Sequence, residues 1–496
     1  MKRVSLPLIA IIIGACLPSV AFAGGFETPD NGAEALARGG AWTAKADSPL
    51  AQEYNVAGLA RLRGTRVELG ANILFNVYDF TRSGAYPGTA GDPNTPYAGM
   101  AYPKVGNQGP PFFAPLFAAS SDFGYFDRWT FGLAIFGPSS VGNRSFPAAL
   151  TGTPQGGLLP SPQRYDITDS NLLIFYPTLS AAVRVTRWLD IGLALHLVYG
   201  SFDLANVAIA DLGGCGHGNE FPPCDARNHL SLTGFTATGA LGVMARPIEQ
   251  LQLGLNVRGP VYLDASGTVD SPGSKMLNPT GNSPPLTGPA SSFKTTLPWV
   301  VRFGARWRFL GRDKFEHGDI ELDAIYEGWG SVQGDGIHLT VDSIGPLSGF
   351  STVLLHHYQD TFGIRLGGAF NLRLPQGVLS FRAGGYYDSN ATRYKDTRLD
   401  FDTMAKWAGT VGLGYTIRGV TINLAYAFVW EPDRNVSNGD LQPLNGINGT
   451  STSSTDGHPY PAVNNGLYHA QTQIMSFALL IHFDELLKKK RVIRYY

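Results

Sequence analysis

Several stretches of the chain alternate between apolar residues and residues that are small, polar or charged. From 361 to 374, one set of alternate positions is almost wholly apolar and includes Phe362, Ile364 and Leu366. The other set includes glycine, threonine, asparagine and the two arginines Arg365 and Arg373. Successive side chains of a β-strand point to opposite faces, so each such stretch predicts a strand with one apolar face.

The same alternation recurs along the chain and predicts about fourteen strands, with boundaries uncertain by a few residues. The stretches 336–343 and 358–373 are either parts of one strand or alternatives for it. The predicted strands are 65–80, 112–121, 128–138, 171–186, 188–206, 229–245, 250–268, 293–310, 318–329, 336–343 with or replaced by 358–373, 377–388, 404–418, 419–431 and 469–483.

The connectors between these strands alternate between short and long. Short periplasmic turns opposite long external loops are typical of outer-membrane barrels, whereas a soluble β-sandwich has no reason to sort its loops. Lipid cannot satisfy backbone N–H and C=O groups, so a membrane-spanning sheet must close. We therefore expect an all-β protein in which 65–483 forms a transmembrane antiparallel β-barrel with long extracellular loops.

Composition excludes other classes. Charged residues make up 16% of the chain and the mean hydropathy is −0.04, which is too polar for a helical membrane protein. The net charge of −1 gives no sign of nucleic-acid binding. The histidines are scattered and no serine-centred motif accompanies them, so we expect no catalytic residues, no metal site and no cofactor.

The N-terminus predicts export. Lys2 and Arg3 precede the apolar stretch 6–17, and Ala21-Phe22-Ala23 forms a small-residue cleavage site, so 1–23 is a predicted signal peptide. An alternative is a lipoprotein site with Cys16 lipidated. In an oxidising compartment, Cys215 and Cys224 are expected to form a local disulfide. The alternative is a metal site with His217, for which the ligand set is incomplete.

The segment 24–64 does not alternate and is rich in small residues, with helix-like pieces at 32–38 and 49–53. A barrel of this size has a lumen wide enough to leak unless it is filled. We therefore expect 24–64 to form a plug, or hatch, inside the barrel; a periplasmic linker is the alternative. The residues 484–496 are an addition after the last strand and predict a basic periplasmic tail.

Short motifs in this segment and in the strands resemble the outer-membrane long-chain fatty acid transporter family (FadL-type), which includes transporters of aromatic hydrocarbons. The family usually has proline where this chain has Val56, after the asparagine of the hatch. The motifs that carry the resemblance are Gly25-Phe26, Arg38-Gly39-Gly40-Ala41, Ala46-Asp47, Asn55-Val56-Ala57-Gly58-Leu59, Trp129 to Gly137, Tyr176 to Ala182, Leu297-Pro298, Tyr326 to Trp329 and Phe381 to Asp388.

The resemblance implies passive uptake of hydrophobic molecules across the outer membrane of a Gram-negative bacterium. The hatch, including Gly25 and Asn55, would gate an internal pocket, and an opening in the third strand would deliver the molecule sideways into the membrane. Gly137-Pro138 is our candidate for that opening, because proline removes a donor from the ladder. A simple strand end before the loop is the alternative.

Two kinds of residue are candidates for ligand contact. The apolar candidates are Phe26, Phe112, Phe113, Leu158 and Leu159. Arg365 and Arg382 are candidates for holding a fatty-acid carboxylate through bidentate contacts, although most inward charges are expected to form ion pairs that brace barrel and plug.

The expected partners are a hydrophobic small molecule, lipopolysaccharide and outer-membrane lipid, with the protein acting as a monomer and binding no nucleic acid. The alternatives are a general aqueous porin, or a surface receptor or adhesin that uses the long loops.

Overall fold

The computed structural model describes residues 31–88, 95–137, 143–151, 158–209, 225–271, 286–334, 336–344, 347–400, 404–443 and 462–487. Several predictions concern residues outside these ranges: the signal peptide, Cys16, Gly25, Phe26, Pro138, the Cys215–Cys224 disulfide and most of the 484–496 tail.

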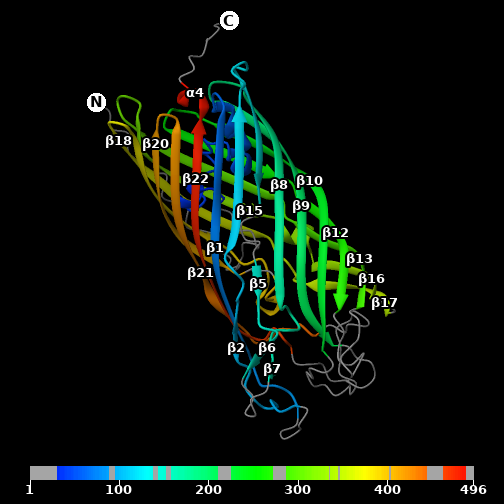
Figure 1. The fold of residues 1–496 in the computed structure, drawn as a ribbon. Coiled ribbons are helices and arrows are strands. Elements are labelled where there is room, and N and C mark those ends of the chain that lie inside the picture. The colour runs from blue at the N-terminus through cyan, green and yellow to red at the C-terminus, as the bar shows by residue number, and fades with distance from the viewer. Residues whose placement is uncertain are drawn as a thin grey trace, which may run out of the picture.

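Within the described ranges, fourteen strands form a closed antiparallel β-barrel, which confirms the predicted fold class (Figure 1). Some of these strands consist of two labelled segments, and a few short labelled strands lie in the connectors. Closure comes from the first and last strands, which pair along their whole length from Arg66↔His482 to Arg82↔Gly466. A closed barrel leaves no unpaired sheet edge for lipid to face.

The strands are β1 (Arg66–Arg82), β2 (Lys104–Gly106), β3 (Phe112–Ser121), β4 (Trp129–Phe136), β5 (Asn143–Ser145), β6 (Ala149–Thr151), β7 (Leu158–Pro160), β8 (Asp169–Arg184), β9 (Leu189–Ile209), β10 (Asp225–Ala245), β11 (Leu251–Arg258), β12 (Val261–Ser271), β13 (Leu286–Leu297), β14 (Val300–Leu310), β15 (Glu316–Glu327), β16 (Gly336–Ile344), β17 (Leu347–Leu355), β18 (Thr361–Leu374), β19 (Gly377–Asp388), β20 (Lys406–Ile417), β21 (Val420–Val436) and β22 (Gly466–His482). The helices are α1 (Ala33–Ala37), α2 (Ala51–Tyr54), η1 (Val56–Arg61), α3 (Trp329–Val332), η3 (Tyr394–Asp396) and α4 (Phe483–Leu486). Within the described ranges, no helix is both long enough and apolar enough to cross a bilayer.

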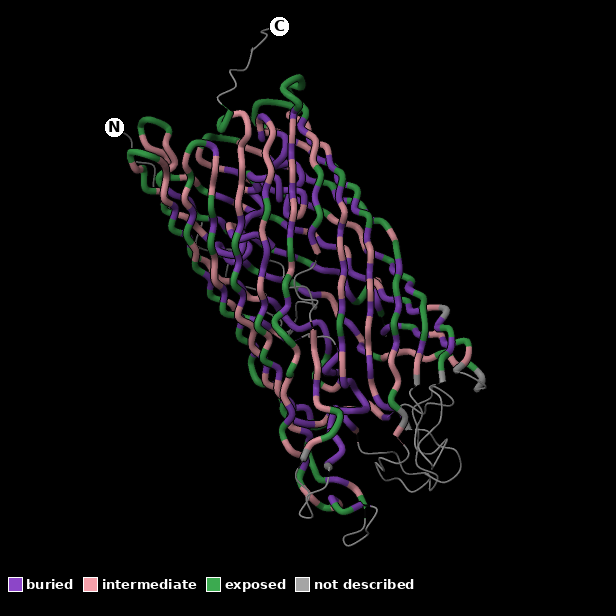
Figure 2. The backbone as a smooth tube through the Cα atoms, in the orientation of Figure 1, coloured by how far each residue is buried: buried purple, intermediate pink, exposed green. Residues whose placement is uncertain are grey.

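The predicted alternation is confirmed in β18. Ile364 and Leu366 are 46% and 50% exposed and face outward, while Arg365 between them is buried. Figure 2 shows the same division around the wall, with buried residues gathered inside the barrel. The apolar faces therefore form the outside of the wall, as a membrane barrel requires.

Two predicted strands are each broken by a proline. The stretch predicted as 250–268 consists of β11 and β12, separated at Gly259-Pro260, and both halves pair with β10. The stretch predicted as 293–310 consists of β13 and β14, separated at Pro298-Trp299. A proline lacks the N–H that a ladder needs, which accounts for both breaks.

The ambiguity between 336–343 and 358–373 resolves into two different elements. The stretch 358–373 corresponds to β18, which pairs with β15 in the wall. The stretch 336–343 corresponds to β16, which forms a hairpin with β17 and pairs with β13. The hairpin therefore extends the sheet at the long-loop end, beyond the end of β15.

The N-terminal segment (residues 31–64) lies within the barrel, near the end where the short turns and α4 lie (Figure 1). Its alanine-rich helix α1 stops before Gly39 and Gly40, whose φ values of 63° and 74° favour glycine. Trp42 and Tyr54 meet edge to face with ring centroids 5.3 Å apart. The segment thus has a small core of its own.

Val56 does not disrupt the turn that follows α2. Asn55 is extended at φ −159°, and its side-chain oxygen accepts a hydrogen bond of 3.2 Å from the N–H of Ala57. This contact caps η1, which begins at Val56, and proline is not required there.

Candidate functional site

Three carboxylates on one face of β15 hold the N-terminal segment. Asp319 and Glu321 accept hydrogen bonds from Arg38 at 2.6 and 3.2 Å. Asp323 accepts from the backbone N–H groups of Trp42 and Thr43 at 3.0 and 2.9 Å. The alternation of the strand places every second side chain inward, so one strand supplies all three acceptors.

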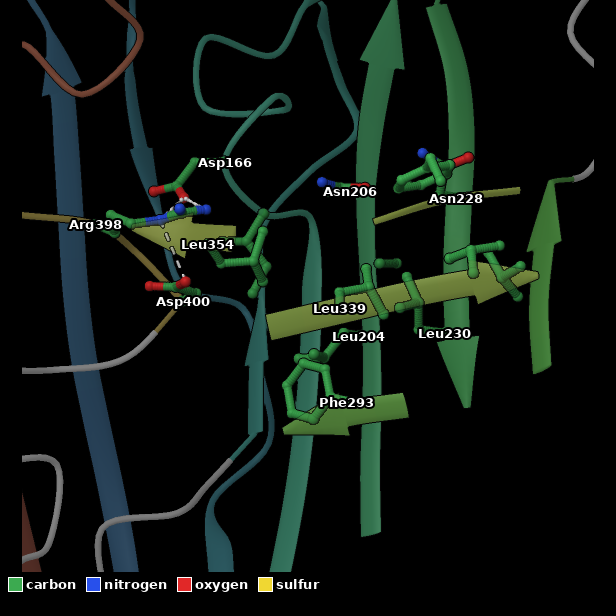
Figure 3. Close-up of a pocket in the computed structure, with 15 residues that line it drawn as sticks. Asp166, Leu204, Asn206, Asn228, Leu230, Phe293, Leu339, Leu354, Arg398 and Asp400 are labelled. Atoms are coloured by element: carbon green, nitrogen blue, oxygen red, sulfur yellow. Dashed lines mark hydrogen bonds and ion pairs between the residues drawn. The ribbon is translucent and has the colours of Figure 1, made fainter. Parts of the chain in front are cut away.

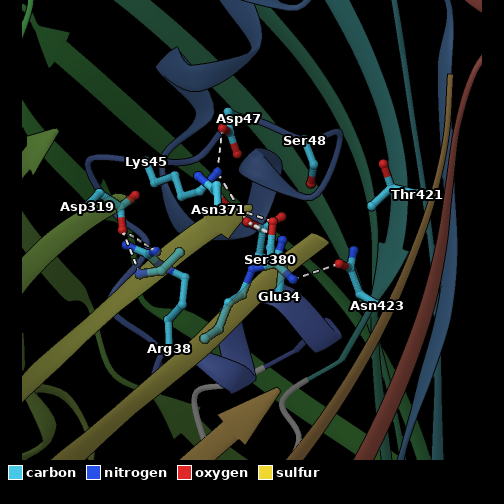
Figure 4. A network of polar contacts seen from close by, with 12 residues as sticks. Glu34, Arg38, Lys45, Asp47, Ser48, Asp319, Asn371, Ser380, Thr421 and Asn423 are labelled. Atoms are coloured by element: carbon cyan, nitrogen blue, oxygen red, sulfur yellow. Dashed lines mark hydrogen bonds and ion pairs between the residues drawn. The ribbon is translucent and has the colours of Figure 1, made fainter. Parts of the chain in front are cut away.

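Further ion pairs tie the segment to neighbouring strands. Arg382 on β19 lies 3.1 Å from Glu34 of α1, and it also donates to Asn423 on β21 at 2.9 Å. Arg306 on β14 donates to Asp319 at 2.6 Å, so it shares that carboxylate with Arg38. Figure 4 shows Arg38 beside Asp319, and Glu34 on the side of Asn423. The predicted bracing of the barrel by inward charges is confirmed.

A ring of inward-facing glycines lets the N-terminal segment approach the wall closely. On β18 and β19, a Cβ at Gly367 or Gly384 would overlap the Arg38 carbonyl group. On β14, a Cβ at Gly304 would lie 2.9 Å from the backbone nitrogen of Ala44. We call this ring the glycine belt, and its members are Gly132, Gly192, Gly242, Gly254, Gly304, Gly367, Gly384 and Gly412.

Within the described residues, the wall is interrupted where β4 stops. β4 pairs with β8 as far as Phe136↔Tyr176, and pairing with β8 resumes only at β5, where Asn143 meets Asn171. Among the ladder pairs of the described chain, 172–175 therefore lack a partner on this edge. The side chain of Asn31 reaches the same place and hydrogen-bonds the carbonyl oxygen of Gly137.

An apolar cavity of about 70 Å³ lies toward the long-loop end (Figure 3). Its apolar lining comes from β9 and β10, from β12 and β13, from the β16–β17 hairpin, and from Ile167 in the connector before β8. These residues are Ile167, Leu204, Ala205, Leu230, Val269, Phe293, Leu339, Val341, Phe350 and Leu354. Its apolar lining with few polar groups is like that of small-molecule sites, but its volume is smaller than the roughly 300–1,000 Å³ of a whole ligand pocket.

A buried charged group closes one side of this cavity. Arg398 lies 3.0 Å from Asp166 and 3.2 Å from Asp400, and Figure 3 shows both pairs. Burial raises the pKa of the Asp166 carboxyl above its usual range, although Arg398 acts in the opposite direction. Burial also acts against the charge of Arg398, but Asp400 and Asp166 hold its pKa above the usual range.

One continuous apolar cluster joins the cavity to the wall interruption. It contains Leu339 and Phe293 from the cavity lining, Phe202 on β9, and Phe136 and Ile174 at the interruption. The rings of Phe202 and Phe293 lie with centroids 5.0 Å apart. Apolar packing therefore extends from the cavity lining to the end of β4.

Comparisons with known proteins agree with this architecture. The family model described as Outer membrane protein transport protein (OMPP1/FadL/TodX) matches residues 14–460. The chain belongs to this family. No curated protein sequence matches the chain.

Solved structures of this family share the fold. A Pseudomonas aeruginosa FadL homologue is 16% identical with a TM-score of 0.71, covering 93% of this chain and 100% of that one. The Ralstonia pickettii toluene transporter TbuX is 17% identical with a TM-score of 0.62, covering 92% and 98%. The P. putida toluene transporter TodX is 18% identical with a TM-score of 0.63, covering 92% and 99%. At these identities the likeness establishes the fold alone.

The structure separates the two phenylalanines predicted to contact ligand. Phe112 is buried and packs in a cluster with Leu36 of α1 and with Leu74. Phe113 is 54% exposed and lies opposite Ile73 on the outward face. Leu159 is buried among the tyrosines of the β1–β3 connector, and the backbone of Leu158 belongs to β7. Their role as ligand contacts stays a prediction.

The two arginines predicted to hold a carboxylate already have partners. Arg365 makes a bidentate contact with Asp388 at 2.6 and 2.9 Å. Arg382 contacts Glu34, as described above. Asn55, predicted as part of the gate, donates to the carbonyl oxygens of Thr43 and of Val243 on β10, at 3.0 and 3.1 Å. It therefore bridges the segment and the wall, and its gating role stays a prediction.

Sequence reasoning missed the cavity itself. Ile337, Leu339 and Val341 alternate with polar residues in a stretch assigned to the same strand as 358–373, and reading it as a separate inward hairpin would have found part of the lining. No local signal could have found the pair of Asp166 and Arg398, because the two residues are 232 positions apart.

Proposed function

We propose that this protein carries hydrophobic small molecules passively across the outer membrane of a Gram-negative bacterium. The observation that supports this proposal is the apolar cluster between the cavity and the wall interruption. It would give a hydrophobic molecule an apolar path from the lumen through the wall into the membrane. A water-filled pore would not help such a molecule, because leaving water for hydrocarbon is already favourable.

In this proposal the loops capture the molecule and the cavity holds it. The molecule then leaves between β3 and β8, beyond Phe136 toward the long-loop end. The N-terminal segment acts as the hatch that blocks the axial route. Its ion pairs with β15 and β19 support this role, and so does its fit to the glycine belt. The contact of Asn31 with Gly137 supports a link between hatch and side opening.

The family supports transport over catalysis, because it is a family of outer membrane transport proteins. Two structural neighbours are named toluene transporters, which supports a hydrophobic cargo without identifying it for this chain. We propose that the protein acts as a monomer among lipid and lipopolysaccharide. Its barrel closes on itself and so needs no second copy to complete the sheet.

The test is reconstitution of the full chain in liposomes, with two rates measured on the same preparation. We expect uptake of a hydrophobic probe above that of empty liposomes and no passage of sugar. Removal of residues 24–60 should open the lumen and allow sugar to leak. Free sugar passage through the intact protein would instead establish an aqueous porin and overturn the proposal.

A further inference from the structure

The cavity has one basic side chain, and that side chain is already satisfied. Among the described residues that line the cavity, Arg398 is the only lysine or arginine. Its Nε and Nη2 atoms face Asp166, with Nε at 3.1 Å, and Nε also lies 3.2 Å from Asp400. The backbone N–H of Leu399 adds a further bond of 2.6 Å to Asp166.

A nearby histidine reinforces this arrangement. His356 places Nε2 3.0 Å from Asp400 and Nδ1 2.8 Å from the carbonyl oxygen of Leu354. Both partners are hydrogen-bond acceptors, so His356 adds to the contacts that hold Asp400 in place. Among the described residues that line the cavity, no lysine or arginine is left to receive a ligand carboxylate, because Arg398 already faces Asp166 and Asp400.

The cavity also has a neutral polar edge. Asn206 on β9 and Asn228 on β10 lie directly opposite each other and both line the cavity. Neither side-chain amide hydrogen-bonds to another group in the part of the chain that the structure describes. Figure 3 draws the two amides apart from the Arg398 group, with Leu354 between them in the view. An amide offers both a donor and an acceptor to a neutral partner.

We propose that the cavity selects uncharged hydrophobic molecules with one hydrogen-bonding group, such as a medium-chain or aromatic alcohol, over ionised acids. The apolar lining takes the carbon atoms nearest the hydroxyl, since a cavity of about 70 Å³ is smaller than the whole molecule, and the amides of Asn206 and Asn228 take the hydroxyl. An ionised carboxylate would lose its hydration and face Asp166 and Asp400 without a free cation, which is costly in an apolar site. This inference rests on the proposed function and names its substrate class.

The experiment compares three probes with hydrocarbon parts of similar size: 1-octanol, octane, and octanoate at pH 8. Binding to the full-length protein in nanodiscs is measured by equilibrium dialysis, with empty nanodiscs subtracted. We expect 1-octanol to bind about fivefold more tightly than octane, as one net hydrogen bond allows. We expect octanoate to bind at least about tenfold more weakly than 1-octanol. Octanoate binding as tight as 1-octanol would overturn the proposal.

A double variant, Asn206→Leu with Asn228→Leu, tests the amides. It should weaken 1-octanol binding to the level of octane and leave octane binding unchanged. The matched control is Asn371→Leu, whose amide donates to the Glu316 carbonyl in the wall at 3.0 Å, far from the cavity lining. Unchanged 1-octanol binding by the folded double variant would overturn the role of the amides. If the double variant fails to fold, the comparison of the three probes on the native protein still decides the ligand class.

Uptake into proteoliposomes separates this inference from the proposed function. If none of the three probes enters faster than into empty liposomes, the transport function fails. If octanoate enters as fast as 1-octanol, transport stands and the selection of uncharged molecules is wrong.

Discussion

The side chain of Asn31 donates a hydrogen bond of 2.6 Å to the carbonyl oxygen of Gly137, the residue that follows β4. The same amide donates to Glu53 of α2 at 3.0 Å, and the Asn31 carbonyl accepts from the Tyr54 hydroxyl at 2.9 Å. One residue therefore joins the N-terminal segment to the place where the wall is interrupted. Any displacement of the segment at this point must break the bond to Gly137.

Replacement of Asn31 tests this link. Asn31→Ala removes the bond to Gly137, worth about 1 kcal/mol, together with the bond to Glu53 within the segment. If the bond stabilises the resting state, its loss should raise the population of the rearranged state, and with it the uptake rate, by up to about fivefold. Initial rates of hydrophobic probe uptake into proteoliposomes measure this. The control is Asn371→Ala, which loses an amide-to-carbonyl bond within the wall and should leave uptake unchanged. Equal rates for both variants would contradict the link.

Arg38 should be the most costly single side chain to remove from the segment. It is fully buried between Asp319 and Glu321, so Arg38→Met leaves the buried Glu321 without an arginine and leaves Asp319 with Arg306 alone. Breaking a buried pair on one side costs about 3–5 kcal/mol. Urea unfolding of the variant in detergent micelles should show a loss of that size.

Two further variants give this experiment its controls. Arg373→Met breaks a pair with Asp313 in which both side chains are more than half exposed, so it should cost less than about 1 kcal/mol. Adding Glu321→Gln to Arg38→Met should recover part of the lost stability, because the uncompensated charge of Glu321 is then removed. A loss equal to that of Arg373→Met would show that the network does not hold the segment.

The wall was predictable from the sequence because alternation is a local signal. The stretch 112–121 coincides with β3 (Phe112–Ser121), and 377–388 coincides with β19 (Gly377–Asp388). The last strand was predicted to end on Phe483, but β22 ends at His482 and Phe483 begins α4. The breaks at Pro260 and Pro298 were missed, because the residues on both sides continue the apolar pattern.

The site was predictable only in part, because it depends on contacts between distant residues. The sequence predicted that inward charges would brace the barrel, since arginines and carboxylates recur on inward faces. It could not assign Arg38 to Asp319 and Glu321, which are 281 and 283 positions away along the chain. The cavity arises from the β16–β17 hairpin packing beside β9 and β10, and this packing has no signal in any one stretch.

The glycine belt gives a prediction for the fit of the segment. Gly367→Val places a side chain against the Arg38 carbonyl, so the segment must move away from β18. We expect a sugar leak that the native protein lacks, measured by liposome swelling. The control is Gly409→Val on β20, where a Cβ would have no atom within 4 Å. A leak in the control, or none in Gly367→Val, would count against a seated segment.

The predicted disulfide is tested by mass. Cys215 and Cys224 lie in one long connector between β9 and β10. The exported protein, unfolded without reductant and treated with iodoacetamide, should gain no adduct on these two residues. It should gain two adducts after reduction. Alkylation of both residues without reduction would show free thiols, and the staple would be wrong.

Phe112 and Phe113 are neighbours in β3, and their side chains face opposite sides of the wall. Their alanine variants change the same strand, so a difference in uptake reports which face matters. Phe112 points inward at the side of the interruption and packs with Leu36 of α1, while Phe113 points outward. Phe112→Ala should lower the initial rate of hydrophobic uptake several-fold, because it removes apolar surface where the segment meets the proposed exit. Phe113→Ala should leave that rate within about twofold, because the outer face of β3 meets lipid in either variant. Uptake rates normalised to folded protein, judged by the heat-induced mobility shift in gels, measure the difference. A similar loss in both variants would mean that the strand matters only for the stability of the wall, and the proposed exit beside it would lose its support.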